Sequence, residues 1–168
     1  IYLDYETKEK DVIDIYKLKT ADYTITGPFE LGLSLNDKTI TKKLKKALEN
    51  IGIAFQIKDD ILGIYGDSKV MGKPNTSDIE EYKQTILYTY TINTKYKDQL
   101  LKYYGKTITE EELEKVRDIF IKSDALKYSE NIMNELFKEA EEIINNEKLK
   151  EKIKEILKGL IEYIKERN

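Results

Sequence analysis

The chain has 168 residues, 36% of them charged, and its formal net charge is only −3 because acidic and basic residues nearly balance. This length suits one domain with its own hydrophobic core, and the mixed charge indicates no basic field for nucleic acid. No apolar run is long enough to span a membrane, and no signal peptide is visible. The absence of cysteine fits a cytoplasmic protein, and the absence of histidine leaves carboxylates, lysines, tyrosines, amides and hydroxyls for any chemistry.

Helical periodicity runs along the chain. A first helix is predicted over residues 11–26, and Gly27-Pro28 is expected to interrupt it because proline removes a helix hydrogen bond. An apolar continuation to about residue 35 precedes the central helix, which is predicted to begin near residue 38. Gly66 ends that helix and starts a loop rich in glycine and proline. The remaining helices are predicted, in chain order, over residues 77–93, 95–105, 109–122, 123–145 and 147–167.

Two helix starts carry the signature of a capping box, in which a hydroxyl residue is followed three positions later by glutamate. Ser77 with Glu80, and Thr109 with Glu112, have this spacing. The sequence shows no convincing strand, repeat or low-complexity segment. Together these patterns predict an all-α fold, in which short connections make neighbouring helices mostly antiparallel, as in a bundle.

The central helix contains the stretch IGIAFQIKDDILGIYGD, residues 51–67, which is apolar or small at nearly every position. A helix that is apolar all round is buried, and two adjacent carboxylates on it are costly unless their charge is compensated. A divalent cation with oxygen ligands would compensate them. Lysine or arginine partners in a structural network, or a solvated helix face, are the competing interpretations. At 3.6 residues per turn, one acidic stripe is formed by Gln56, Asp60, Gly63 and Asp67, with Asp59 beside it.

Basic residues flank this acidic stripe in the sequence. Lys19 precedes it on the first helix, Lys73 follows in the loop, and Lys83 lies on the next helix. Carboxylates that hold magnesium, with lysines around them, make a cradle for a diphosphate. Thr20 and Gln56 add side-chain dipoles that can face positive charge developing on a substrate.

The order of these motifs resembles that of the trans-isoprenyl diphosphate synthases. Lys19-Thr20 stands where this family has its Lys-Thr pair. The similarity also covers YLD at 2–4 and the stretch 103–130, and so extends over most of the chain. The resemblance implies the antiparallel helical bundle of the isoprenoid synthase type. The family's second aspartate-rich region is matched by FQIKDDIL at 55–62, GD at 66–67, GK at 72–73, SD at 77–78 and Lys83.

The resemblance implies a prenyl transfer. An allylic diphosphate ionises, isopentenyl diphosphate attacks the carbocation, and a longer farnesyl or geranylgeranyl diphosphate forms after a proton is lost. Asp59 and Asp60 would bind Mg2+ that bridges to the allylic diphosphate. Asp78 and Lys83 would support the metal–diphosphate shell, with Lys83 among the substrate-binding residues.

The same resemblance implies the remaining substrate contacts. Lys19 and Lys73 would contact the allylic diphosphate, and Phe55 would flank the isopentenyl unit. Thr20 and Gln56 would place oxygens near the carbocation, which makes Lys19, Thr20 and Gln56 the candidate catalytic residues. The structural alternatives are that Thr20 bonds back to its own helix and that Phe55 is a plain core residue.

Two features depart from the family pattern. The second motif of the family often ends in a third aspartate, and that position is Gly63 here. The first aspartate-rich motif, which binds the other side of the metal cluster, would lie N-terminal to everything in this chain, whose first residue is Ile1. We therefore expect residues 1–168 to be the C-terminal portion of a synthase that needs an N-terminal half for activity. That half would be a separate polypeptide, a proteolysed partner or a part of the protein outside this sequence, and the assembled unit is expected to dimerise.

Three other functions compete with a half-enzyme. A non-catalytic regulatory subunit of a prenyl synthase would explain the missing motif, and a helical scaffold would use the aspartates structurally. A terpene cyclase of similar fold is the third, and Lys19-Thr20 with Gly72-Lys73 argue against it. The product length is set by residues below the first motif, so farnesyl and geranylgeranyl products both remain open.

Overall fold

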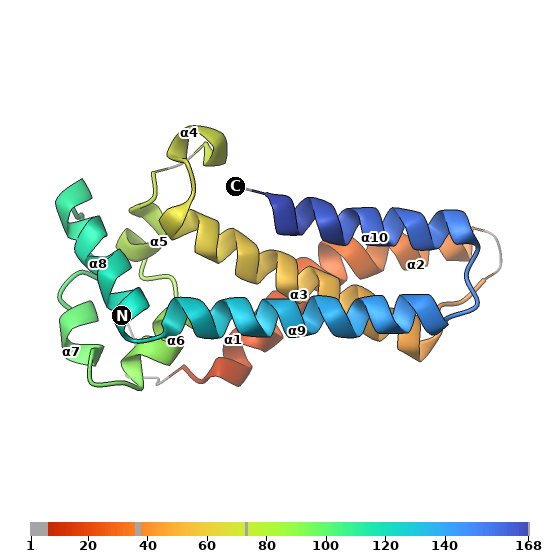
Figure 1. Cartoon of the computed structure of the whole chain (residues 1–168), viewed down its shortest axis with the longest axis horizontal. Helices are drawn as coiled ribbons and strands as arrows, with labels where there is room; N and C mark the ends of the chain where they lie inside the picture. Colours follow the sequence, from red (N-terminus) through yellow and green to blue (C-terminus); the bar gives the residue numbers. More distant parts are fainter. Residues whose placement is uncertain (1–6, 36–37, 73, 168) are drawn as a thin grey trace. The chain divides into compact units, whose positions relative to one another are not determined.

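The computed structural model describes residues 7–35, 38–72 and 74–167, and every regular element in those ranges is a helix (Figure 1). This confirms the predicted all-α fold. No helix among these residues is both long enough and apolar enough to cross a lipid bilayer. The elements are α1 (Glu9–Tyr16), the π-helix η1 (Lys17–Thr26), α2 (Gly27–Ser34), α3 (Lys42–Tyr65), α4 (Ser68–Met71), α5 (Ser77–Glu80), α6 (Ile86–Ile92), α7 (Lys97–Leu100), α8 (Glu110–Lys122), α9 (Ala125–Asn146) and α10 (Glu151–Glu166).

The described chain divides into two compact units. Residues 13–58 and 131–167 form one, which we call the hairpin unit because α9 and α10 form a helical hairpin in it. Residues 7–12 and 59–130 form the other, which we call the short-helix unit because it contains α4 to α8. Helices α3 and α9 each contribute residues to both units, so neither unit is a separate stretch of sequence.

In the hairpin unit, α3 packs closely against η1, α9 and α10. A Cβ atom at Gly52 would lie only 2.3 Å from the Cα of Ala21, so the absence of a side chain lets η1 approach α3. The amide of Asn50 on α3 donates to Glu139 on α9 over 2.7 Å. The most buried large side chains of this core are Leu48, Ile51, Ile57, Phe137, Ile144 and Ile161.

The first predicted helix, over residues 11–26, is an α-helix up to Tyr16 and a π-helix after it. Residues 17–26 form a π-helix, and the N–H of Gly27 donates to the carbonyl of Asp22, five residues back. Pro28 then occupies the first turn of α2, where a missing N–H costs nothing. The expected interruption at Gly27-Pro28 is therefore a transition between two helices, and it widens the helix that carries Lys19 and Thr20.

In the short-helix unit, the last turn of α3 packs on α8. The Nε of Arg117 donates to the carbonyl of Ile64 over 2.7 Å, and the hydroxyl of Tyr65 donates to the carbonyl of Arg117 over 2.9 Å. The loop after α3 returns to the end of that helix, because the amide of Asn75 donates to the carbonyl of Leu62 on α3 over 3.4 Å and to that of Gly66, just after α3, over 3.0 Å.

The predicted helix over residues 77–93 is wrong. The helix stops at Glu80, and Tyr82 adopts the left-handed conformation, with φ of 56°. Thr85 then caps a new helix, α6, by accepting from the N–H of Tyr88. Ser77 lies inside the first turn of α5 and is not its cap, so the Ser77–Glu80 spacing was misleading. By contrast, the Thr109–Glu112 capping box at the start of α8 is confirmed.

Candidate active site

Helix α3 carries the predicted acidic residues, and most of it is buried as expected. Gln56 exposes 6% of its surface and Asp60 only 2%, whereas Asp59 is partly exposed. Asp67 is not on this stripe. It lies beyond the end of α3, exposed, where its side chain caps α4 by accepting from the N–H of Lys69.

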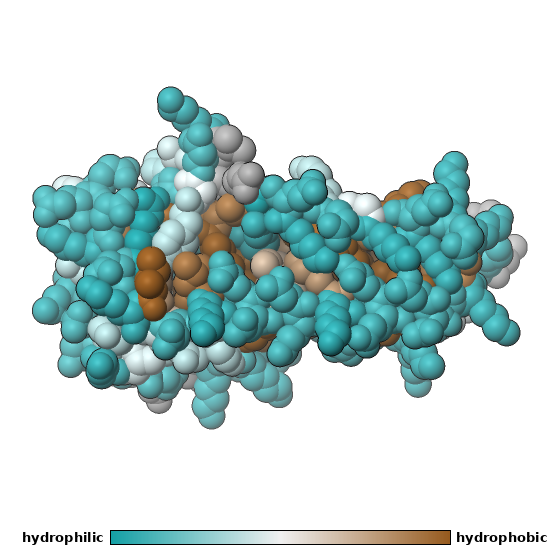
Figure 2. All heavy atoms as spheres, viewed as in Figure 1, coloured by the Kyte–Doolittle hydropathy of each residue, from teal (hydrophilic) through white to brown (hydrophobic). Residues whose placement is uncertain are grey.

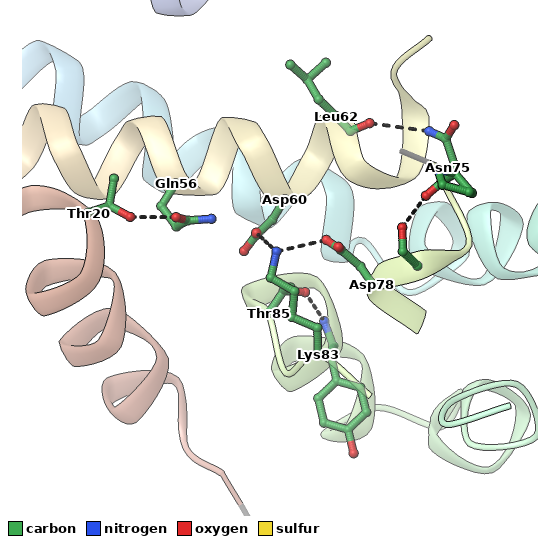
Figure 3. A network of polar contacts seen from close by, with 11 residues as sticks. Thr20, Gln56, Asp60, Leu62, Asn75, Asp78, Lys83 and Thr85 are labelled. Atoms are coloured by element: carbon green, nitrogen blue, oxygen red, sulfur yellow. Dashed lines mark hydrogen bonds and ion pairs between the residues drawn. The ribbon is translucent and has the colours of Figure 1, made fainter. Parts of the chain in front are cut away.

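Lys83 joins two of the predicted carboxylates. Its Nζ lies 2.7 Å from Oδ1 of Asp60 and 3.0 Å from Oδ2 of Asp78, as Figure 3 shows. Both carboxylates are buried, and Lys83 itself keeps about a quarter of its side chain exposed, at 27%. We call these three residues the carboxylate–lysine cluster. It confirms that the aspartate stripe has a lysine partner, as one interpretation of the sequence proposed.

The charge state of the cluster follows from its surroundings. Burial lowers the pKa of Lys83, but the carboxylates of Asp60 and then Asp78 raise it by more, so its pKa lies above its ordinary value. The ammonium stays protonated at neutral pH. One protonated ammonium therefore lies between two buried carboxylates.

The donors fit a hard divalent cation only in part. Every predicted ligand is a carboxylate oxygen, the type that magnesium prefers. The sequence contains no histidine or cysteine, so imidazole nitrogen and thiolate ligands are absent. Among the described residues no group of three or more acidic side chains is placed to hold a metal. Magnesium commonly binds proteins through one or two carboxylates and takes its other ligands from water and phosphates, so the arrangement suits a metal that arrives with a diphosphate.

Thr20 and Gln56, both in the hairpin unit, form a buried pair. The hydroxyl of Thr20 on η1 donates to Oε1 of Gln56 on α3 over 2.6 Å (Figure 3). Because that bond fixes the amide, the amide nitrogen points away from Thr20 as a donor, and the hydroxyl oxygen keeps its acceptor sites. Thr20 uses its hydrogen on Gln56 and not on its own helix. Lys19, the residue before it, is exposed to solvent.

The other predicted substrate residues are placed differently. Phe55 is half-buried, and the guanidinium of Arg167 lies 5.3 Å from the centroid of its ring. This cation–π contact makes Phe55 more than a core residue, and Arg167 was not singled out from the sequence. Lys73 lies outside the described residues.

Several residues that shape the site could not be found from sequence. Tyr82 reverses the chain so that Lys83 points back to α3, and the N–H of Lys83 donates to the carbonyl of Asp78 over 2.9 Å. Three tyrosine rings, Tyr82, Tyr88 and Tyr104, pack edge to face or tilted, with centroids 4.7 to 5.7 Å apart. Burial raises the pKa of Tyr104 well above its ordinary value, so it stays neutral. A bulky residue with positive φ has no marker in the sequence.

Solved structures define the class of protein to which this fold and site belong. Geranylgeranyl pyrophosphate synthetase from Pyrococcus horikoshii superposes with a TM-score of 0.79 at 28% identity, over 96% of this chain and 50% of that one. Geranylgeranyl pyrophosphate synthase from Corynebacterium glutamicum, crystallised with isoprenyl diphosphate and magnesium, gives a TM-score of 0.84 at 26% identity, over 95% and 47%. The helical fold is that of the prenyl diphosphate synthases.

Sequence comparison gives the family. The polyprenyl synthetase model matches residues 2–120, and the chain belongs to this family. The geranylfarnesyl diphosphate synthase of Aeropyrum pernix is 35% identical over 129 residues, and the geranylgeranyl diphosphate synthase of Sulfolobus acidocaldarius is 36% identical over 148 residues. These alignments cover 76% and 83% of this chain but 41% and 44% of the relatives. The chain therefore spans less than half the length of these relatives.

Proposed function

We propose that this chain is the C-terminal half of a magnesium-dependent prenyltransferase that condenses an allylic diphosphate with isopentenyl diphosphate. The carboxylate–lysine cluster carries the proposal, because it places two buried carboxylates and a protonated lysine together in a member of the polyprenyl synthetase family. The synthase titles among the relatives, and the C. glutamicum structure with isoprenyl diphosphate and magnesium, support it. Farnesyl and geranylgeranyl diphosphate are the proposed products.

In this proposal, Asp59 and Asp60 hold the magnesium ion, with Asp78 behind them. Bound magnesium would supply positive charge to the diphosphate leaving group. Lys83 contributes a second positive charge, from the protein, and its raised pKa keeps the ammonium protonated at neutral pH. Carboxylate oxygens, which Asp60 and Asp78 both provide in buried positions, are the ligand type that magnesium prefers.

Lys19, Lys73, Thr20, Gln56 and Phe55 have the remaining roles. The lysines neutralise the diphosphate as it leaves, which lowers the barrier to ionisation. Gln56 holds the Thr20 hydroxyl through a 2.6 Å hydrogen bond, so the hydroxyl oxygen forms a fixed dipole that stabilises the carbocation without reorganising. Phe55 provides an apolar wall for the isopentenyl unit.

The chain also needs a partner in this proposal. We infer an N-terminal half polypeptide, followed by dimerisation of the assembled unit, and a cytoplasmic location. Large hydrophobic side chains are exposed on α1, η1 and α2 and at the end of α2, namely Ile15, Leu18, Tyr23, Leu31 and Leu35. Exposed apolar patches mark interaction surfaces. Figure 2 shows hydrophobic atoms reaching the surface between the hydrophilic side chains that cover most of the visible face.

The test is to purify the tagged chain from the cells that make it and to assay the complex with magnesium, geranyl diphosphate and radiolabelled isopentenyl diphosphate. Asp60→Asn is expected to lower the rate by about 100-fold or more, since the variant would lose a carboxylate that holds the magnesium ion and with it the positive charge that stabilises the leaving group. Asp98→Asn, on the exposed first turn of α7, is the matched control and retains the rate. Full activity of the Asp60 variant would contradict the proposal.

A non-catalytic subunit is the second candidate, because no group of three or more acidic side chains among the described residues is placed to hold a metal. Native mass spectrometry beside a denaturing mass identifies any second polypeptide that accompanies the chain. If that polypeptide alone makes the product at the full rate, the regulatory function is correct. If activity needs both polypeptides and the Asp60 carboxylate, the half-enzyme is correct.

A further inference from the structure

A partly enclosed cavity of about 590 Å³ lies in the hairpin unit, where α2, the start of α3 and the α9–α10 connection meet (Figure 1). We call it the α2–α10 cavity. Its volume falls in the range of about 300–1,000 Å³ that is usual for small-molecule sites. Apolar side chains line it from all three segments, namely Phe29, Leu33, Leu44, Leu149 and Ile153. Leu44 is buried and the other four are half-buried, so the fold leaves part of this apolar lining uncovered.

Hydrogen bonds hold the walls of the α2–α10 cavity in place. The hydroxyl of Thr41, the residue before α3, accepts from the N–H of Leu44 over 3.1 Å and donates to the carboxylate of Glu147 over 2.9 Å. These two bonds join the start of α3 to the α9–α10 connection. On the other side, the N–H of Lys38 donates to the carbonyl of Leu33 on α2 over 3.1 Å. The cavity is thus built from bonded segments of one unit.

The mouth of the cavity carries positive charge. Among the described residues that line it, three are lysines, Lys38, Lys148 and Lys150, and one, Glu147, is acidic. The three lysines are exposed to solvent, whereas the Glu147 carboxylate already accepts the hydroxyl hydrogen of Thr41. Lysine is a common partner of phosphate groups in proteins. An apolar lining with ammonium groups at its mouth is complementary to a hydrocarbon chain that ends in an anionic head.

We propose that the α2–α10 cavity binds a single-chain amphiphile with a phosphate head, whose chain lies against the apolar lining and whose head lies at the three lysines. A membrane-binding surface inserts protruding apolar side chains among lipids, whereas a concave cavity of this volume encloses one chain. The inference uses neither magnesium nor the carboxylate–lysine cluster, so it goes beyond the proposed function and either can fail without the other.

The test is isothermal titration calorimetry on the chain purified from the cells that make it, with any polypeptide that accompanies it, in EDTA to remove magnesium. The probe is dodecyl phosphate below its micelle concentration. Inorganic phosphate tests the head alone, and dodecyl maltoside tests the same chain with an uncharged head. Dodecyl phosphate is expected to saturate at one molecule per chain and to bind at least about tenfold more tightly than either.

A plug variant tests the position of the ligand. Gly32 on α2 also lines the cavity, and a Cβ atom there meets no neighbouring atom within 4 Å. Gly32→Phe therefore adds a ring at the cavity wall without a collision, and it is expected to weaken binding by about tenfold or more because the ring takes up space that the chain needs. Gly159→Phe is the matched control, since its Cβ also meets open space, on α10 outside the cavity, and it retains the affinity.

A second pair of variants tests the head group. Lys148→Gln/Lys150→Gln is expected to weaken binding by about tenfold and to make it less sensitive to salt, because two charged partners of the phosphate are lost. Lys138→Gln/Lys158→Gln removes two exposed lysines that do not line the cavity, and both quantities stay unchanged. If Gly32→Phe melts at a lower temperature than the wild type, this lysine pair decides the outcome.

Four results would overturn the inference. Dodecyl phosphate that does not bind the wild type, or that binds Gly32→Phe with full affinity, would show that the cavity does not hold it. Binding that is lost in Asp60→Asn would assign the amphiphile to the candidate active site. Binding to vesicles of phosphatidic acid, without binding to the dispersed amphiphile, would assign the lysines to a membrane surface.

Discussion

At the scale of single residues, the ammonium of Lys83 is the group on which the candidate site most depends. It satisfies two buried carboxylates at once, at 2.7 and 3.0 Å. Removing one partner of a buried ion pair costs more than the pair contributes, because the remaining charge stays buried without compensation. Loss of the Lys83 ammonium would remove an ion-pair partner from two buried carboxylates at once.

We therefore expect Lys83→Met to lower the free energy of unfolding by about 3 kcal/mol, measured by urea denaturation in the absence of magnesium. Lys115→Met is the control, since Lys115 forms a 2.7 Å ion pair with Glu111 that is exposed to solvent. Surface pairs of this kind add little stability, so the control is expected to unfold like the wild type. Equal losses in the two variants would show that the burial of the cluster has no energetic importance.

A second residue-scale effect appears at alkaline pH. Burial, and then the charge of Asp78, raises the pKa of Tyr104 above its ordinary value of 10.0 in the folded chain. The unfolded tyrosine ionises near pH 10, but the folded one does not. The stability that depends on neutral Tyr104 is thus fully present below pH 10 and is lost as the pH rises above it.

Between pH 9 and pH 11, Tyr104→Phe is expected to lose about 1 kcal/mol less of its free energy of unfolding than the wild type, because phenylalanine cannot ionise in either state. The measurement is urea denaturation at a series of pH values. Tyr163→Phe is the control, since Tyr163 lies on α10 with 64% of its surface exposed. If the stability curves of wild type and Tyr104→Phe run parallel up to pH 11, the burial argument fails.

At the scale of elements, the approach of η1 to α3 depends on one glycine. The nearest atom to a Cβ at Gly52 would be the Cα of Ala21, a backbone atom that cannot rotate away. Ala21 follows Thr20 directly, so any displacement of η1 there also moves the hydroxyl that donates to Gln56.

Gly52→Ala is expected to lower the free energy of unfolding by about 2 kcal/mol through overpacking, despite alanine's better helix propensity. Gly159→Ala on α10 meets open space and should raise it by up to about 1 kcal/mol. Thermal or urea denaturation gives both values. Opposite signs in the two variants support close packing of η1 on α3, and a stabilising Gly52→Ala would contradict it.

Element prediction succeeded where helix signals were local and failed where a distant contact intervened. The capping box at Thr109 is complete within four residues, and α8 begins there as predicted. The Ser77–Glu80 spacing looked equivalent, yet α5 ends after one turn. The reversal at Tyr82 is compatible with the fold because its ring packs against Tyr88 and Tyr104, and Tyr104 is more than twenty residues away.

At the scale of the whole molecule, the distribution of exposed apolar side chains predicts how the isolated chain behaves. Among the residues that the structure describes, eight large hydrophobic side chains are exposed. Five of them fall between residues 15 and 35, and two lie on α10. A concentrated set of this kind favours association, whereas single exposed residues are common on any surface.

Ile15→Glu/Leu18→Glu is expected to reduce self-association of the isolated chain, measured by sedimentation velocity at matched concentrations, and to weaken co-purification of a partner. Ile156→Glu/Tyr163→Glu introduces the same charge at two exposed hydrophobic positions of α10 and is expected to change neither result. If both double variants behave alike, general solubility and not a specific surface accounts for the effect.

The sequence by itself determined the helical fold, the family and the aspartate pair of the central helix, because these depend on periodicity and on residue types in a fixed order. It also predicted Asp78 and Lys83 as members of the site. Only the tertiary structure decided how they meet. The absence of a side chain at Gly63 matters only when α5 packs against it, and the left-handed Tyr82 packs against the rings of Tyr88 and Tyr104. Contacts between distant residues, and backbone conformations that a residue type does not favour, leave no pattern in a single sequence.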